Sequence, residues 1–304
     1  MKSFATLIVI GALTVPVWAE GPQADGMDAM KKNEPPAVVH WARGEGRPSQ
    51  GSKSPNMTSH GGPVMSSVTV GAIFWGTSWA NDTFIGDKIT GLDSWYTDVQ
   101  KSKYSMTNGE YTGSGNTQFV STGVTYLGSV VDASPGPTKA PTTSAVLAEV
   151  CKVVTNPVAN GYYPVYIDSK RGHAGYCAWH SAGSCGGTPV QFGIGFFFNL
   201  DGDAGCDPQD TSTGHSQGLA ALANVTGHEF SETITDPRLN AWYDAQGEEN
   251  ADKCAWTFSP SLVDFGKTTW KIQGNWSNAA HDASAGYDKS GCIDGSGFLA
   301  AGVQ

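Results

Sequence analysis

The segment HSQGLAALANVTGHEFSETIT, residues 215–235, constrains the fold more than any other part of this 304-residue chain. Its small and apolar residues recur at a spacing that predicts a helix, and Pro237 ends that helix. Its second half also carries three titratable side chains, His228, Glu229 and Glu232. Burying such groups on an otherwise apolar helix is costly unless a partner compensates their charge. We therefore expect a buried helix whose polar end meets a compensating group, and a metal ion is one candidate.

Residues 228–232 form an H-E-x-x-E motif. Zinc peptidases commonly carry H-E-x-x-H, in which two histidines one helical turn apart bind the metal and the glutamate acts as the base. On a helix, His228 and Glu232 share one face and could bind one divalent cation. Zinc is expected, and calcium or manganese would be tolerated because a carboxylate replaces the second histidine. Glu229 would then be the catalytic base. The alternative is an exposed helix end whose charged groups are solvated.

A third metal ligand is required from another part of the chain. Glu249 and Asp252 lie in the segment GEENADKCAW, and a disulfide bond at Cys254 could hold this segment near the helix. We predict that one of these two residues is the ligand. Asp236 is less suitable, because on a continuing helix it would lie about 12 Å from His228 by rise alone. The alternative for Glu249 and Asp252 is an acidic surface turn. His180 could reach the site from a loop, with a packed or hydrogen-bonded histidine as the alternative.

Residues 1–19 predict a secretory signal peptide. Lys2 is followed by an apolar run from Phe4 to Val17, and a small-residue cleavage site ends at Ala19. This run is too short to span a bilayer, and no later stretch is a candidate transmembrane helix. We therefore expect a secreted protein.

The chain contains six cysteines, at positions 151, 177, 185, 206, 254 and 292. An even number of cysteines in an exported chain indicates disulfide bonds. A cysteine metal cluster is a weaker interpretation, because no C-x-x-C pair occurs. The spacing leaves the connectivity open, and we predict the pairs Cys254–Cys292 and Cys185–Cys206.

Composition and missing motifs exclude several classes of function. The net charge of −10 argues against nucleic acid and anionic membranes as partners, because phosphate binding requires a basic surface. A serine hydrolase has no support, since no G-x-S-x-G motif occurs. Residues 200–207, LDGDAGCD, begin like a calcium loop but lack its later glycine and glutamate, so they predict a turn.

The remaining pattern predicts one large domain. Residues 20–62 are rich in Gly, Pro, Ser and Lys and predict a flexible lead-in. The order of the later segments predicts an α+β fold, with a mixed β-sheet covered by helices and a loop-rich, disulfide-bonded tail. This order is zincin-like by analogy of fold alone. Strands are expected at 67–76, 117–131, 162–168 and 188–200, and helices at 82–103, 143–154 and 215–235.

The chain resembles the EXORDIUM, or phosphate-induced protein, family of secreted proteins. The similarity begins at HGGPVMSSVTVGAIFWGTSW (60–79) and continues through GYCAWHS (175–181) and NLDGDAGCD (199–207). It is most specific in HEFSETITDPRLNAWYDAQGEENADKCAW (228–256). The resemblance implies a single extracellular domain over residues 63–304, but no particular biochemical activity. The motif positions carried over from the family are His228, Glu229, Glu232, Asp236, Glu249, Asp252 and Cys254.

These observations support two functional hypotheses. In the first, a secreted protein of zincin-like architecture is a zinc-dependent peptidase, and Glu229 deprotonates the attacking water. Its metal ligands would be His228, Glu232 and either Glu249 or Asp252. In the second, a non-catalytic extracellular or cell-wall-associated protein holds a structural ion or none. Both hypotheses predict a monomer whose partner is an extracellular peptide or a cell-wall polymer.

Overall fold

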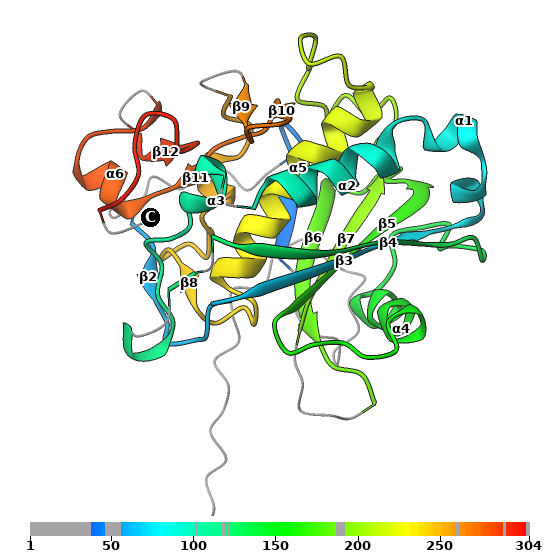
Figure 1. Cartoon of the computed structure of the whole chain (residues 1–304), viewed down its shortest axis with the longest axis horizontal. Helices are drawn as coiled ribbons and strands as arrows, with labels where there is room; N and C mark the ends of the chain where they lie inside the picture. The colour runs from blue at the N-terminus through cyan, green and yellow to red at the C-terminus, as the bar shows by residue number, and fades with distance from the viewer. Residues whose placement is uncertain are drawn as a thin grey trace, which may run out of the picture.

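A computed structural model describes residues 38–45, 56–100, 102–116, 119–120, 122–186, 192–258, 262–287 and 290–301. These residues form a mixed α+β fold around a six-stranded sheet with the strand order β1-β6-β7-β5-β3-β4 (Figure 1). The predicted signal peptide, residues 1–19, lies outside the described ranges. Within those ranges, no helix combines the length and the hydropathy needed to cross a membrane.

The sheet is mixed because β6 runs opposite to the other five strands. Strands β4, β3, β5 and β7 are parallel, whereas β6 runs antiparallel to β7, and β1 runs antiparallel to β6. All eight residues of β7 are buried, as expected of a strand that is covered on both faces. The strands are β1 (Val38–Trp41), β3 (Val68–Trp75), β4 (Val124–Asp132), β5 (Gly161–Lys170), β6 (Tyr176–Gly183) and β7 (Phe192–Asn199).

Helices cover both faces of this sheet. Helices α2 (Lys88–Asp98) and α5 (Gln217–Thr235) lie on one face, and α4 (Thr143–Val153) lies on the other (Figure 1). The Ser216 side chain caps α5 by accepting a hydrogen bond from the Leu219 N–H at 3.1 Å. The mixed sheet covered by helices is therefore confirmed.

Helix α5 is held against the sheet by a chain of hydroxyl groups and by a close approach at a glycine. The Tyr166 hydroxyl on β5 is 2.8 Å from the Tyr96 hydroxyl on α2 and 2.8 Å from Thr226 Oγ1 on α5. On β7, a Cβ added at Gly193 would lie 2.5 Å from the Thr233 methyl group of α5. The absence of a side chain at Gly193 thus lets α5 pack directly on the centre of the sheet.

Short elements complete the chain, most of them in a loop-rich tail that lies beside α5 (Figure 1). The antiparallel pairs are β2 with β8, β9 with β10, and β11 with β12. The short helices are α1 (Asp82–Ile85), α3 (Lys103–Met106), α6 (Asn278–Asp282), η1 (Thr77–Ala80), η2 (Ser114–Asn116) and η3 (Asp252–Cys254). The short strands are β2 (Thr58–Ser59), β8 (Trp242–Tyr243), β9 (Val263–Asp264), β10 (Thr269–Trp270), β11 (Asn275–Trp276) and β12 (Cys292–Ile293).

The disulfide bonds are Cys151–Cys185, Cys177–Cys206 and Cys254–Cys292. The predicted Cys254–Cys292 pair is confirmed, and the predicted Cys185–Cys206 pair is wrong. Because β6 and β7 are antiparallel, Cys177 near the start of β6 lies beside the turn after β7 that carries Cys206. Cys185 follows the opposite end of β6, about 25 Å away along the strand, where it reaches α4.

Two strands of the six-stranded sheet differ from the sequence prediction. Strand β1 lies within residues 20–62, for which a flexible lead-in is predicted, and β6 includes His180, for which a loop is predicted. Four residues are too few to display a period-two pattern, and β6 mixes glycine, serine and histidine with its apolar residues. Both strands are buried because each pairs with a neighbour in the sheet, which is a non-local cause.

Replacing Gly193 with alanine should lower the free energy of unfolding by about 1–3 kcal/mol, because the new methyl group would meet Thr233. Thr233 is held in place, since its hydroxyl donates a hydrogen bond to the Glu229 carbonyl at 2.7 Å. Adding Thr233→Ser removes the opposing methyl group and should restore most of the loss. Urea denaturation measures both effects. Gly71→Ala is the control, because its Cβ would lie at an ordinary 3.4 Å from Tyr163. Equal losses at both glycines, or no recovery in the double variant, would contradict this account.

Candidate metal centre

The part of α5 that carries the H-E-x-x-E motif is completely buried. His228, Glu229 and Glu232 each have 0% of their surface exposed. The His228 Nε2 atom is 2.9 Å from Glu232 Oε1, as expected for residues one helical turn apart. The alternative of an exposed helix end with solvated charges is therefore excluded.

Asp252, at the start of η3, joins this pair from outside the helix. Its Oδ1 atom is 3.4 Å from His228 Nε2, and its backbone N–H donates a hydrogen bond to Glu232 Oε1 at 3.0 Å. Its second carboxylate oxygen accepts a hydrogen bond from the Glu249 N–H at 3.2 Å. The fold thus brings Asp252 together with both residues of the helix that the sequence predicts as ligands.

Glu249, the other predicted third ligand, contacts a different histidine. Its Oε2 atom is 2.8 Å from His180 Nε2, and the same nitrogen is 3.5 Å from Glu232 Oε2. His180 lies on β6 rather than on a loop and is fully buried. Glu249 therefore belongs to the cluster through His180 and not through His228.

His40 is a member of the cluster that sequence reasoning missed. It lies on β1, and its ring stacks on the His228 ring with centroids 3.8 Å apart and planes 24° apart. The Trp256 ring lies at 4.9 Å. Burial, followed by the charge of His228, lowers the pKa of His40. No local signal could have identified His40, because its position depends on the pairing of β1 with β6.

Other acidic residues that the sequence brought into consideration lie outside the cluster. Asp236 Oδ1 accepts hydrogen bonds from the backbone N–H groups of Asn240 and Ala241, at 2.6 and 2.8 Å, and so stabilises the turn that follows α5. In the segment 200–207, Asp201 pairs with Lys88 at 2.5 Å and Asp203 pairs with Arg171 at 2.5 Å. These aspartates bind the protein's own cations, in agreement with the predicted turn.

Burial dominates the protonation of the cluster. It raises the pKa of Glu229, and it raises that of Glu232 to about 7, with the Asp252 charge adding to the second shift. Burial, followed by the charge of His228, lowers the pKa of His180 to about 3. Burial also opposes protonation of His228, but the charge of Glu232 and the Asp252 hydrogen bond raise its pKa overall. A positive charge on His228 is therefore favoured beside these carboxylates, and a divalent cation could supply that charge instead.

The donor atoms of the cluster fit a divalent cation. In each of three groups, the ligand atoms lie within 4.8 Å of one another: His228, Glu232 and Asp252; His180, Glu229 and Glu232; and His40, His228 and Glu229. Several of these buried atoms have no hydrogen-bond partner within the described part of the chain. They are both carboxylate oxygens of Glu229, both ring nitrogens of His40 and Glu232 Oε2. An unpaired buried polar atom costs about 1–3 kcal/mol, and a cation would satisfy these atoms together.

The Gln273 side chain orients the His228 ring. Its Nε2 atom is 3.0 Å from His228 Nδ1 and donates a hydrogen bond to the Ala251 carbonyl at 2.8 Å. Its Oε1 atom accepts a hydrogen bond from the Trp256 N–H at 3.3 Å. These contacts keep His228 Nε2 directed at the carboxylates. A cation on Nε2 would leave the ring proton on Nδ1, so the Gln273 amide would have to turn its oxygen toward that proton.

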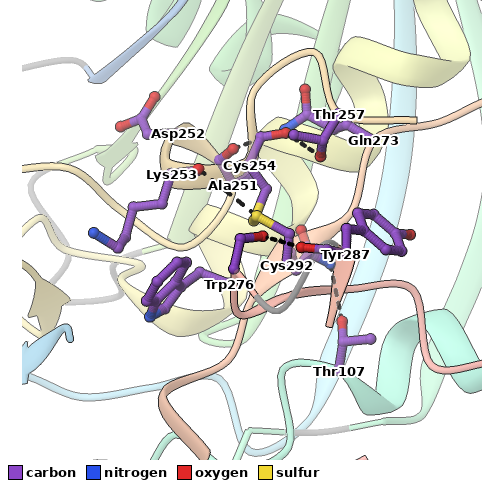
Figure 2. The surroundings of a disulfide bond; sticks show 12 residues. Thr107, Ala251, Asp252, Lys253, Cys254, Thr257, Gln273, Trp276, Tyr287 and Cys292 are labelled. Carbon is purple, nitrogen blue, oxygen red and sulfur yellow. Dashed lines mark hydrogen bonds between the residues drawn. A yellow bond between two sulfur atoms is a disulfide. The ribbon is translucent and has the colours of Figure 1, made fainter. Parts of the chain in front are cut away.

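The Cys254–Cys292 disulfide fixes the segment that carries Asp252. Figure 2 shows Asp252, Lys253 and Cys254 on one chain segment, which the disulfide joins to the tail at Cys292. The backbone N–H of Trp276, in β11, donates a hydrogen bond to the Asn250 carbonyl at 2.8 Å. The position of Asp252 relative to α5 therefore depends on the contacts of its segment with Trp276 and Cys292.

Replacing Cys254 and Cys292 with serine should destabilise the protein and weaken divalent-metal binding. The disulfide closes a loop with a sequence separation of 38, and the Cys151–Cys185 bond closes one of 34. By chain entropy, removing either bond should cost about 3–4 kcal/mol in the free energy of unfolding. Only the first removal frees the segment of Asp252, so only that variant should bind zinc more weakly than wild type. Urea unfolding and chelator competition measure the two effects, and equal zinc affinities in the two double variants would contradict the prediction.

Replacing Gln273 with leucine should weaken metal binding by about 10–100-fold, because His228 loses the group that orients its ring. Lys271→Met is the control. The Lys271 ammonium donates a hydrogen bond to the exposed Gln209 carbonyl at 2.8 Å and lies outside the cluster. Chelator competition gives the affinities, and circular dichroism checks the fold. An affinity for zinc that is the same in both variants would show that Gln273 has no orienting role.

Comparisons of the chain by family, by sequence and by structure match no protein-family model, no curated protein and no solved structure. The function is therefore inferred from the burial, the distances and the donor atoms of the cluster.

Proposed function

We propose that the protein is a secreted metalloprotein of zincin-like architecture whose buried cluster binds one divalent cation and hydrolyses peptide bonds. The observation that carries the proposal is the Glu229 side chain. It is fully buried next to His228, and neither of its oxygens has a hydrogen-bond partner among the described residues. A structural ion needs only the flanking ligands, so a costly unpaired carboxyl between them favours a chemical role.

His228, Glu232 and Asp252 are the proposed ligands. Of the three groups of donor atoms described above, theirs is the one that combines α5 with η3. Glu249 is given a supporting role, because its carboxylate contacts His180 rather than His228. The proposal therefore takes Asp252 as the third ligand, which the sequence leaves open between the two acidic residues.

Glu229 is the proposed general base. A bound divalent cation would polarise a peptide carbonyl and lower the pKa of water. Glu229 would accept the proton of the attacking water and deliver it to the leaving amine. Its place next to His228, one residue along the helix, keeps its carboxyl group within reach of the same ligand atoms.

Zinc is the proposed ion. A donor set of one imidazole and two carboxylates suits zinc, which binds nitrogen and oxygen ligands in small numbers. Manganese accepts the same donors, whereas calcium prefers six or more oxygen ligands. The imidazole therefore makes calcium the least suitable of the three ions.

The proposed setting is extracellular. Three disulfide bonds are typical of an oxidising compartment. The resemblance of residues 228–256 to the EXORDIUM family and the signal-peptide pattern of residues 1–19 support the same setting. We propose a monomer that acts on an extracellular peptide, with a cell-wall polymer as the other candidate partner. The net charge of −10 speaks against nucleic acid and anionic membranes.

A structural ion in a non-catalytic extracellular protein is the second candidate function. The complete burial of His228, Glu229 and Glu232 favours it, because a hydrolase must admit water and substrate to its base. The two candidates therefore differ in the access to the cluster and in the role of Glu229.

Glu229→Gln and Glu232→Gln separate the two candidates. Glu232→Gln should lose most of the bound zinc, because it removes a ligand charge, whereas Glu229→Gln should retain the zinc and the fold. Under the peptidase proposal, Glu229→Gln should lower hydrolysis of a peptide library by about 10²-fold or more. Hydrolysis is measured with wild-type protein and with His40→Ala, because the His40 ring covers His228.

A zinc-free wild-type protein whose melting temperature ignores both chelator and added zinc would contradict the metal centre. Zinc binding without hydrolysis in wild type and in His40→Ala would leave the structural ion as the function. Hydrolysis that is unchanged by Glu229→Gln would contradict the role of Glu229.

A further inference from the structure

Strand β1 reaches the cluster from a distant part of the chain. It pairs antiparallel with β6, with Val38 opposite His180 and His40 opposite Ala178. It is the outermost strand on this side of the sheet. Residues 38–41 therefore occupy the edge of β6, the strand that carries His180 into the cluster.

The His40 side chain is aimed into the cluster rather than toward solvent. It is fully buried, it stacks on His228 at 3.8 Å, and neither of its ring nitrogens has a hydrogen-bond partner in the described ranges. One of its nitrogens lies within 4.8 Å of ligand atoms of His228 and Glu229. A buried imidazole with two unpaired nitrogens needs a partner, and a cation is the partner that imidazole nitrogen commonly takes in proteins.

The backbone of β1 also covers the cluster. The backbone N–H of His40 lies near the Glu229 carboxyl group and favours its charged form. The Trp41 carbonyl accepts a hydrogen bond from Trp256 Nε1 at 3.2 Å, which ties the strand to the segment beyond η3. Strand β1 thus lies over Glu229 and His228 and is held there from both sides.

We propose that His40, supplied in cis by β1, is a further ligand of the metal centre together with His228 and Glu229, and that β1 thereby holds the centre in a closed form. This inference rests on the proposed metal centre and deepens it. With His40 on the ion, the position that a water or a substrate carbonyl would take is filled by the protein's own imidazole. Displacing β1 would free that position and the hydrogen-bonding edge of β6 in one step.

The geometry also indicates the class of molecule that the opened form accepts. An exposed strand edge binds an extended polypeptide through backbone hydrogen bonds, as β1 itself does in this structure. The inferred substrate is therefore an extended peptide segment that takes the place of residues 38–41 along β6. A histidine at the position of His40 would make such a peptide a competitor of the protein's own strand.

Cobalt substitution of the full chain tests the ligand role of His40 without an activity assay. We expect His40→Ala to change the visible spectrum of the bound cobalt and to speed cobalt loss to a chelator by at least about 10-fold. Added imidazole should bind the variant, restore a spectrum like that of wild type and slow the loss again. His173→Ala is the control, because His173 is exposed in the turn before β6. Wild type and the control should ignore imidazole.

A second measurement needs no variant and so does not depend on its folding. X-ray absorption at the zinc edge of the full-length wild-type protein should give two imidazole ligands, from His40 and His228. One imidazole, together with an unchanged cobalt spectrum in His40→Ala, would overturn this inference and leave the proposed metal centre intact. Failure of wild type to bind cobalt or zinc would overturn the proposed function itself.

Discussion

The burial of several carboxyl groups and imidazoles together is the constraint on which the rest of this structure depends. Each of these groups would lose its hydration on folding, and a charge without a partner inside a protein is strongly destabilising. The fold therefore has to deliver partners to the same place from segments that are far apart in the sequence. Four segments meet there: β1, β6, the second half of α5 and residues 249–254.

Placing these segments requires close packing at a few defined points. Helix α5 reaches the sheet because Gly193 has no side chain and because the hydroxyl groups of Tyr166 and Thr226 bond across the interface. The segment of Asp252 reaches the helix because the Cys254–Cys292 bond joins it to the tail. Ligand atoms must be held within fractions of an ångström, so packing and covalent constraints around the site are as important as the ligands themselves.

A structural ion and a catalytic ion would use the same donor atoms in this protein. Access would distinguish them, and in the proposed closed form β1 limits that access. With His40 stacked on His228 and the strand paired to β6, the centre has the closed character of a structural site. Without that strand, the same helix would present His228, Glu229 and Glu232 to an open sheet edge. Under this proposal, one short strand determines whether the cluster holds a structural or a catalytic ion.

The sequence by itself determined the elements that depend on local causes. Periodicity and Pro237 define α5, apolar runs define β3, β5 and β7, and the i, i+4 spacing places His228 and Glu232 on one face. Only the tertiary structure placed Asp252 beside His228 and Glu249 beside His180, because a separation of three residues gives no local preference. The tertiary structure was also needed to pair Cys185 with Cys151, because β6 and β7 run antiparallel and this separates Cys185 from Cys206. His40 was beyond local inference, because a four-residue strand has no periodic signal and its burial comes from pairing with a strand that is remote in the chain.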